Sequence, residues 1–162
     1  MPAIDVVTPI TNWVTNKHLD IAEASDLPGG WEIWAQVDIN IWFNRHTAAI
    51  MVRSPNCYII PAGQADFAVT EGLGYQDAVM EFKVWNSVSE QANAFARRLL
   101  ADWQKVRTYT IAGGFTGNRF WSIGISNVNG QNAIQAVLNN AGAQYQCQTF
   151  QGFDVWAFMV DR

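Results

Sequence analysis

Apolar residues recur at helical spacing between Trp31 and His46, a stretch that contains neither glycine nor proline. The recurring positions are Trp31, Trp34, Val37, Ile41 and Trp42. This spacing predicts a buried helix over residues 31–46. Before it, residues 10–24 predict a packed N-terminal segment or short helix, which ends at the glycine- and proline-containing run at 26–30.

Three short apolar segments follow the predicted helix. They cover residues 47–54, 57–70 and 76–85, and turn residues separate them at 54–56 and 71–74. The middle segment is interrupted by a proline and a glycine. Short apolar runs between turn signals predict strands, so this part of the chain should form a three-stranded meander.

A second long helix is predicted from the capping pattern at residues 87–90, Ser-Val-Ser-Glu. In this pattern the serine oxygen and the glutamate bind free N–H groups at the start of a helix. An apolar stripe continues from there to about Arg107. It consists of Val88, Ala92, Phe95, Leu99, Trp103 and Val106.

The rest of the chain alternates between strand and helix patterns. Residues 108–115 and 119–127 predict two strands around a flexible hairpin at 113–117. Residues 130–142 predict a helix, and residues 143–150 and 153–160 predict a closing hairpin of the sheet. Since no repeat or linker divides the chain, residues 1–162 are predicted to form a single mixed α/β domain.

The composition is that of a globular domain with a sizeable core. Of the 162 residues, 49 % are hydrophobic, and eight are tryptophan. No apolar run approaches the roughly 18 residues of a membrane span, and the first residues lack the pattern of a signal peptide. A cytoplasmic or nuclear location and no membrane partner are therefore expected. Cys57 and Cys147 lack the spacing of a zinc site or a disulfide framework.

The charge balance limits how the protein can bind nucleic acid. At pH 7 the formal net charge is −4. Binding to phosphates relies on clusters of lysine and arginine. The sequence therefore excludes a protein that holds nucleic acid through its overall charge, and any such contact must be local.

The most informative polar residues lie on the second and third predicted strands. Asp66 stands in an apolar run, and Glu81-Phe82-Lys83 follows fifteen positions later. Residues i and i+2 of a strand share a face, so Glu81 and Lys83 point the same way while Phe82 points into the opposite layer. Adjacent strands would bring two carboxylates and an ammonium group to one place.

The order of elements and the spacing of these residues resemble the PD-(D/E)XK, or restriction-endonuclease-like, nuclease superfamily. Asp66 matches the motif aspartate, with Ala65 in the place of the motif proline, and Glu81 and Lys83 match the (D/E)XK element. The resemblance covers residues 31–115. It implies a core of helix, three strands, helix and strand (α-β-β-β-α-β), which residues 116–162 extend with a strand, a helix and a hairpin of the same sheet.

These residues also suggest a reaction, the metal-dependent hydrolysis of phosphodiester bonds in nucleic acid. Asp66, Glu81 and the backbone carbonyl of Phe82 would hold Mg²⁺ or Mn²⁺, because hard cations take oxygen ligands. The cation would lower the pKa of a water molecule. Lys83 would orient or help deprotonate that water and counter the developing negative charge. The choice between DNA and RNA stays open, and a two-fold homodimer would suit cleavage of both strands of a duplex.

The predicted helix over residues 31–46 offers a further acid, either Glu32 or Asp38. Glu32 also suits the start of a helix in its own right, because the helix dipole favours a carboxylate there. Asp38 falls on the apolar side, where an unpaired carboxylate is costly to bury. It therefore faces the cleft, or it pairs with Arg45 or Lys105.

Two further residues are candidates for contact with the substrate. Gln91 lies in the predicted helix that follows the motif, where some members of the superfamily carry Gln-x-x-x-Tyr, although Phe95 takes the tyrosine position here. Trp85 lies just beyond Lys83 and offers an aromatic face.

Two other interpretations of the chain stay open. The acidic net charge and Ala65 also suit a catalytically silent nuclease-like fold that acts as a protein-binding or self-assembling module. Alternatively, the chain is an unrelated α+β protein, such as a small self-associating module, in which the spacing is a coincidence and Glu81 and Lys83 form an ordinary ion pair on a solvated face. Geometry separates these interpretations, because a shared cation requires the Asp66 and Glu81 carboxylates to lie within about 5 Å of each other.

Overall fold

The computed structural model of the chain describes residues 5–29, 31–70, 76–112 and 119–162. The helices in these ranges are α1 (Val7–Ser25), α2 (Trp31–His46), α3 (Ala92–Thr108) and α4 (Gln131–Asn140). The strands are β1 (Ile50–Arg53), β2 (Tyr58–Ile60), β3 (Ala62–Gly63), β4 (Phe67–Thr70), β5 (Gln76–Val84), β6 (Thr110–Ile111), β7 (Arg119–Asn127), β8 (Gln146–Phe150) and β9 (Phe153–Asp161). The expectation of a mixed α/β fold is confirmed.

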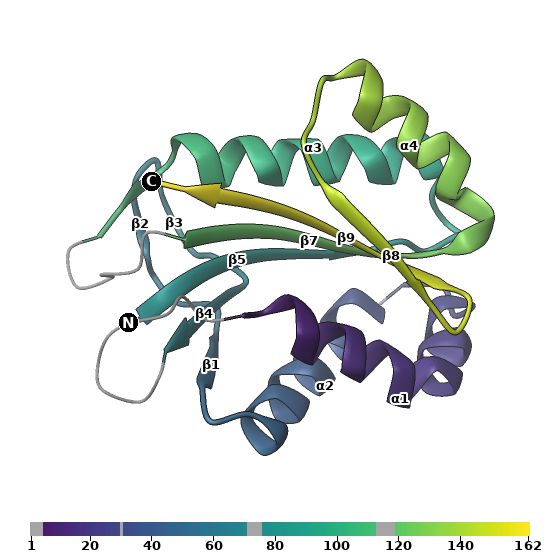
Figure 1. The fold of residues 1–162 in the computed structure, drawn as a ribbon, viewed down its shortest axis with the longest axis horizontal. Helices are drawn as coiled ribbons and strands as arrows, with labels where there is room; N and C mark the ends of the chain where they lie inside the picture. The colour runs from purple at the N-terminus through teal and green to yellow at the C-terminus, as the bar shows by residue number, and fades with distance from the viewer. Residues whose placement is uncertain (1–4, 30, 71–75, 113–118) are drawn as a thin grey trace.

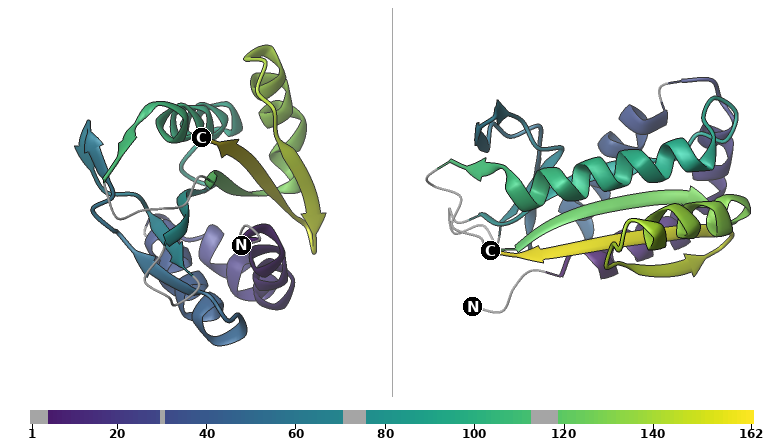
Figure 2. Two further views of the ribbon diagram at one scale, coloured as in Figure 1. Left: turned by 60° about the vertical axis from the view of Figure 1, so that its left-hand side comes forward. Right: turned by 90° about the horizontal axis from the view of Figure 1, so that it is seen from above.

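The elements form three layers around a six-stranded sheet. Helices α1 and α2 cover one face of this sheet, and α3 and α4 cover the other (Figure 1). Seen from above, α3 runs along the direction of the central strands (Figure 2). A second sheet of three short strands, in the order β3-β2-β6, lies near the C-terminal end of α3 (Figure 1).

The strand order in the large sheet is β1-β4-β5-β7-β9-β8. Strands β1, β4 and β5 form the predicted antiparallel meander. Helix α3 then crosses one face of the sheet, and β7 returns parallel to β5. Strands β9 and β8 add antiparallel to β7 and complete the predicted C-terminal hairpin. The chain from α2 to β7 therefore runs helix, three-stranded meander, helix and parallel strand within the large sheet.

The alternation of side chains along β5 separates the two faces of the sheet. Met80, Phe82 and Val84 are buried against α1 and α2. Glu81 and Lys83 point to the face that α3 covers. This helix approaches closely because β7 carries Gly124, where a Cβ would lie 2.6 Å from a methyl carbon of Leu99.

The second predicted strand is divided in the structure. Residues 57–70 form β2, β3 and β4 instead of one strand, because the chain reverses at Pro61 and β2 pairs with β3. In its described part, the predicted strand over 108–115 does not join the large sheet. This part, β6, pairs with β2 in the small sheet, and β7 takes the place beside β5. The strand that follows α3 in the large sheet therefore lies outside the predicted core boundary of 31–115.

Helix α2 has the predicted bounds, whereas α3 begins later than predicted. The first residue of α3 is Ala92 and not a residue of the capping pattern at 87–90. The side chain of Asn86 accepts hydrogen bonds from the backbone N–H groups of Val88 and Ser89, and this turn takes the place of a helix start. The Glu90 carboxylate binds Arg98 at 2.7 Å instead of capping the helix.

The predicted turn at 71–74 and the predicted hairpin at 113–117 lie outside the described residues. Within the part of the chain that the structure describes, none of the helices has the length and apolar character that crossing a membrane requires.

Candidate functional site

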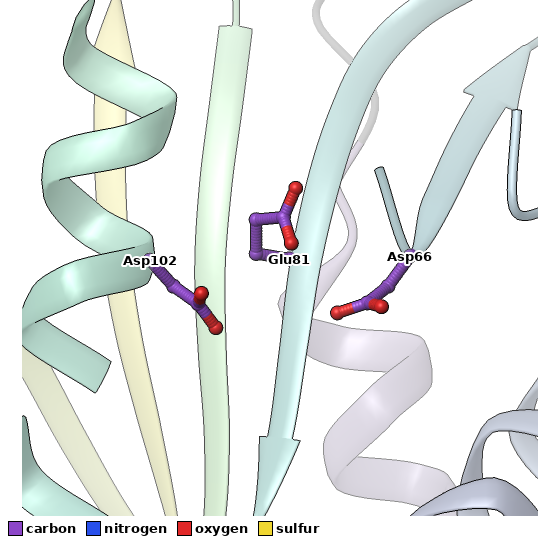
Figure 3. Close-up of side chains that lie close together, drawn as sticks. All are labelled: Asp66, Glu81 and Asp102. Atoms are coloured by element: carbon purple, nitrogen blue, oxygen red, sulfur yellow. The ribbon is translucent and has the colours of Figure 1, made fainter. Parts of the chain in front are cut away.

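Three carboxylates from three different elements converge on the face of the sheet beneath α3 (Figure 3). Asp66 immediately precedes β4, Glu81 lies within β5, and Asp102 projects from α3. Each offers one oxygen to the cluster, and these oxygens all lie within 4.8 Å of one another. The register of β4 and β5 brings Asp66 and Glu81 together. Phe67 pairs with Met80, so Asp66 before Phe67 faces Glu81 after Met80.

Glu81 is the most enclosed member of the cluster. It is only 2 % exposed, and its Oε1 atom accepts a hydrogen bond of 2.9 Å from the Tyr58 hydroxyl. The same oxygen lies 2.8 Å from the Lys105 Nζ atom. Burial and the neighbouring Asp66 carboxylate raise the pKa of Glu81 to about 7, although Lys105 opposes the shift. Near neutral pH this carboxyl group is therefore present in both its protonated and its ionised form.

Lys83 lies among three carboxylates. Its Nζ atom is 3.4 Å from an oxygen of Asp66, 3.4 Å from an oxygen of Asp102 and 3.6 Å from an oxygen of Glu32. Burial alone would lower the pKa of Lys83, but the surrounding carboxylates, Asp102 first, raise it above its ordinary value. Lys83 is therefore a fixed positive charge at neutral pH.

Asp102 and Lys105 were not among the residues expected at the site. Both lie on α3, where Asp102 is three positions after Leu99 and four before Val106. Because those two residues are buried, the spacing places the Asp102 carboxylate on the buried face of the helix. A carboxylate on the apolar stripe of the helix was the signal in the sequence that could have identified Asp102 as a site residue. In the structure, burial raises the pKa of Asp102.

Of the two candidate acids on α2, the structure brings only Glu32 to the cluster. Glu32 lies in the first turn of α2 and contacts both Lys83 and Arg98, the latter at 3.0 Å. Asp38 faces α1 instead. It accepts a hydrogen bond of 2.7 Å from the Trp13 indole and lies 4.0 Å from the Lys17 ammonium, so neither of its predicted basic partners binds it.

The two candidate substrate contacts lie away from the carboxylates. Trp85 is 8 % exposed and packs in the core with Phe95, while its indole N–H donates to the Glu90 carbonyl. This packing leaves the ring without a free face for a base. Gln91 is exposed and occupies the N-cap position of α3.

No protein-family model, curated protein or solved structure matches this chain significantly. Its function must therefore be inferred from the chemistry of the cluster itself.

The donor set fits a hard divalent cation. Such ions take carboxylate and carbonyl oxygens at about 2.1–2.6 Å, so three oxygens within 4.8 Å of one another need to close only slightly around one. The buried Oδ2 atom of Asp102 makes no hydrogen bond of good geometry among the described residues, and its charged neighbour is the Lys83 ammonium at 3.4 Å. The backbone of Phe82 also faces the cluster, because its N–H donates to Asp66 at 2.7 Å and its carbonyl oxygen lies 3.4 Å from the Lys83 ammonium.

The free energy of unfolding, measured in chelator, is expected to fall as the pH rises from about 4.5 to about 7. The native pKa of Glu81 is about 7 against an ordinary 4.5, so in this window the native protein binds a proton that the unfolded chain has released. As the pH rises, the free energy of unfolding falls wherever the native state binds more protons than the unfolded chain. Here the fall is up to about 3 kcal/mol. Urea unfolding across this range measures the slope. Glu81→Gln should flatten it, and an unchanged slope in that variant would assign the titration to another group.

Proposed function

We propose that this protein is a metal-dependent nuclease that hydrolyses phosphodiester bonds of nucleic acid. The observation that carries the proposal is the convergence of Asp66 and Glu81, from adjacent strands, beside the Lys83 ammonium. Acidic ligands for a cation next to a fixed positive charge are the groups that phosphoryl transfer requires.

The topology supports the proposal. Within the large sheet the elements follow the order α2, β1, β4, β5, α3 and β7, with β7 parallel to β5. This order agrees with the α-β-β-β-α-β order that the resemblance to the restriction-endonuclease-like nucleases implies, although the last strand lies beyond residue 115. The motif aspartate precedes the second strand of the meander, and the Glu-x-Lys element lies on the third. We therefore assign the fold of the core to this class as part of the same proposal.

The side chains divide the work of the reaction. Asp66, Glu81 and Asp102 would hold Mg²⁺ or Mn²⁺, with the Phe82 carbonyl as a further oxygen. When bound, the cation supplies a water of lowered pKa and neutralises charge on the phosphate. Lys83 contributes a positive charge beside the scissile phosphate and stabilises the negative charge that develops there.

The protonation of Lys83 favours one of its two expected roles. Its raised pKa keeps the ammonium form at neutral pH, so it stabilises charge and orients groups instead of accepting a proton. Glu81, with its pKa of about 7, is the group in the cluster that gains and loses a proton near neutral pH.

The purified protein is expected to cleave nucleic acid with Mg²⁺ or Mn²⁺ and to lose this activity in chelator. Incubation with plasmid, single-stranded DNA and RNA identifies the substrate, and gel electrophoresis of the products measures the extent of cleavage. Asp66→Asn protein purified in parallel controls for contaminating nucleases. If none of these substrates is cleaved with either cation, the proposal is wrong and a catalytically silent binding module becomes the better explanation.

A further inference from the structure

Lys105 has an unusually well-defined environment for a lysine on the side of a helix. Its Nζ atom lies 2.8 Å from Glu81 Oε1 and donates a hydrogen bond of 3.1 Å to the carbonyl of Gln64. The ammonium also lies 4.9 Å from the centre of the Tyr58 ring and 5.8 Å from that of Tyr109. Such distances allow favourable cation–π contacts. The ammonium is therefore held in one place by groups from four other parts of the chain.

The contact with Glu81 gives this lysine a specific electrostatic effect. Glu81 is almost wholly buried and lies beside two other carboxylates, so its charge needs a nearby cation. Lys105 is the closest cation to it in the described structure. A metal ion bound by Glu81 would replace that neutralisation and would meet the positive charge of Lys105 at short range.

We propose that Lys105 is a positioning residue that acts through Glu81: it is a resident counter-ion that a divalent cation must compete with, and it thereby weakens cation binding at the site. The inference rests on the proposed function, because it concerns the same cation. Lys83 is less suited to this role, since its contacts are longer and are shared among three carboxylates.

The competition separates Lys105 from an ordinary structural lysine. A residue that only stabilised the fold would, when replaced, lower both stability and cation affinity. Removing a competing charge lowers stability in chelator but raises cation affinity, because like charges in a partly buried site repel strongly. The two measured quantities then change in opposite directions.

The test compares Lys105→Gln and Lys105→Arg with the parent chain. Isothermal titration with Mn²⁺ and with Mg²⁺ measures affinity, and urea unfolding in chelator measures stability. Because Lys105 holds the pKa of Glu81 down, the titrations start at about pH 8 and are repeated at higher pH until the affinity of each variant stops changing with pH. Glutamine still offers an N–H to Glu81 without the charge, so its affinity should rise at least about tenfold. Arginine keeps the charge and should therefore leave the affinity closer to that of the parent than glutamine does. Lys17→Gln, which removes a lysine on α1 outside the cluster, is the matched control.

The outcomes distinguish this inference from the proposed function. If the parent binds cations and Lys105→Gln binds them equally or more weakly, the inference is wrong while the metal site stands. Binding by Lys105→Gln alone would support it, because the lysine would then exclude the cation from the parent site. If neither protein binds Mn²⁺ or Mg²⁺, both the inference and the proposed metal site are overturned.

Discussion

Replacing Lys83 by methionine is expected to lower the rate of cleavage at saturating Mg²⁺ by at least about 100-fold, the scale on which a single charge-stabilising donor contributes to such reactions. Cation binding should persist, because Asp66, Glu81 and Asp102 are all retained. The variant therefore separates the two tasks of the site, holding the cation and stabilising the charge on the phosphate. Single-turnover cleavage and isothermal titration measure the two separately.

The same substitution is expected to reduce stability in chelator. Three carboxylates lose their shared counter-ion, and breaking a largely buried ion pair typically costs about 3–5 kcal/mol. Saturating Mg²⁺ should restore much of this loss. Lys83→Arg keeps the charge and provides a folded comparison. Lys17→Met, outside the cluster, should retain full activity. Cleavage by Lys83→Met at the parent rate would remove the lysine from the proposed mechanism.

The proximity of Asp66, Glu81 and Lys83 could be predicted from sequence because it depends on local rules. Alternation along β5 places the glutamate and the lysine on one face, and a short connection makes β4 the neighbour of β5. No knowledge of the rest of the fold was required. The predicted bounds of α2 rested on equally local features, the absence of helix breakers and the regular spacing of apolar residues.

Residues that depend on the orientation of a helix could not be placed in the same way. Asp38 and Asp102 both fall on the apolar side of a helix, but only Asp38 was predicted from the sequence as a candidate site residue. The structure turns Asp38 toward α1, where the Trp13 indole binds it, and turns Asp102 toward β5. Which surface each helix faces is decided by packing across the sheet, and neither helix pattern carries that information.

The failure of the capping pattern at 87–90 has a related cause. The Asn86 side chain accepts from the N–H groups of Val88 and Ser89, and its backbone carbonyl accepts from the Glu90 N–H that the capping serine would bind. Arg98 competes for the Glu90 carboxylate from two turns along α3. A local motif forms only when no better partner is near in space. The position of Trp85 also depends on contacts beyond its own strand, because its ring packs in the core with Phe95 and its indole N–H donates to the Glu90 carbonyl.

Asp66→Asn is expected to abolish cleavage without lowering stability, which makes it the sharpest test of what the cluster is for. The substitution removes a cation ligand. Since even the partners of metal ligands contribute about 10–100-fold, we expect a loss of activity of at least about 100-fold. The side-chain oxygen of the introduced asparagine would still accept the hydrogen bond from the Phe82 N–H, so the local backbone should be kept.

This substitution should lower the activity without lowering the stability of the protein. The Asp66 carboxylate raises the pKa of Glu81, so its removal relieves repulsion in the cluster, while Lys83 keeps its contacts with Asp102 and Glu32. The free energy of unfolding in chelator at about pH 7 should therefore equal or exceed that of the parent, as urea unfolding can measure. Asp20→Asn on α1 is the control for the chemical change. A cluster that existed for stability would lose stability when Asp66 is replaced, whereas one retained for chemistry gains or keeps stability and loses only its activity.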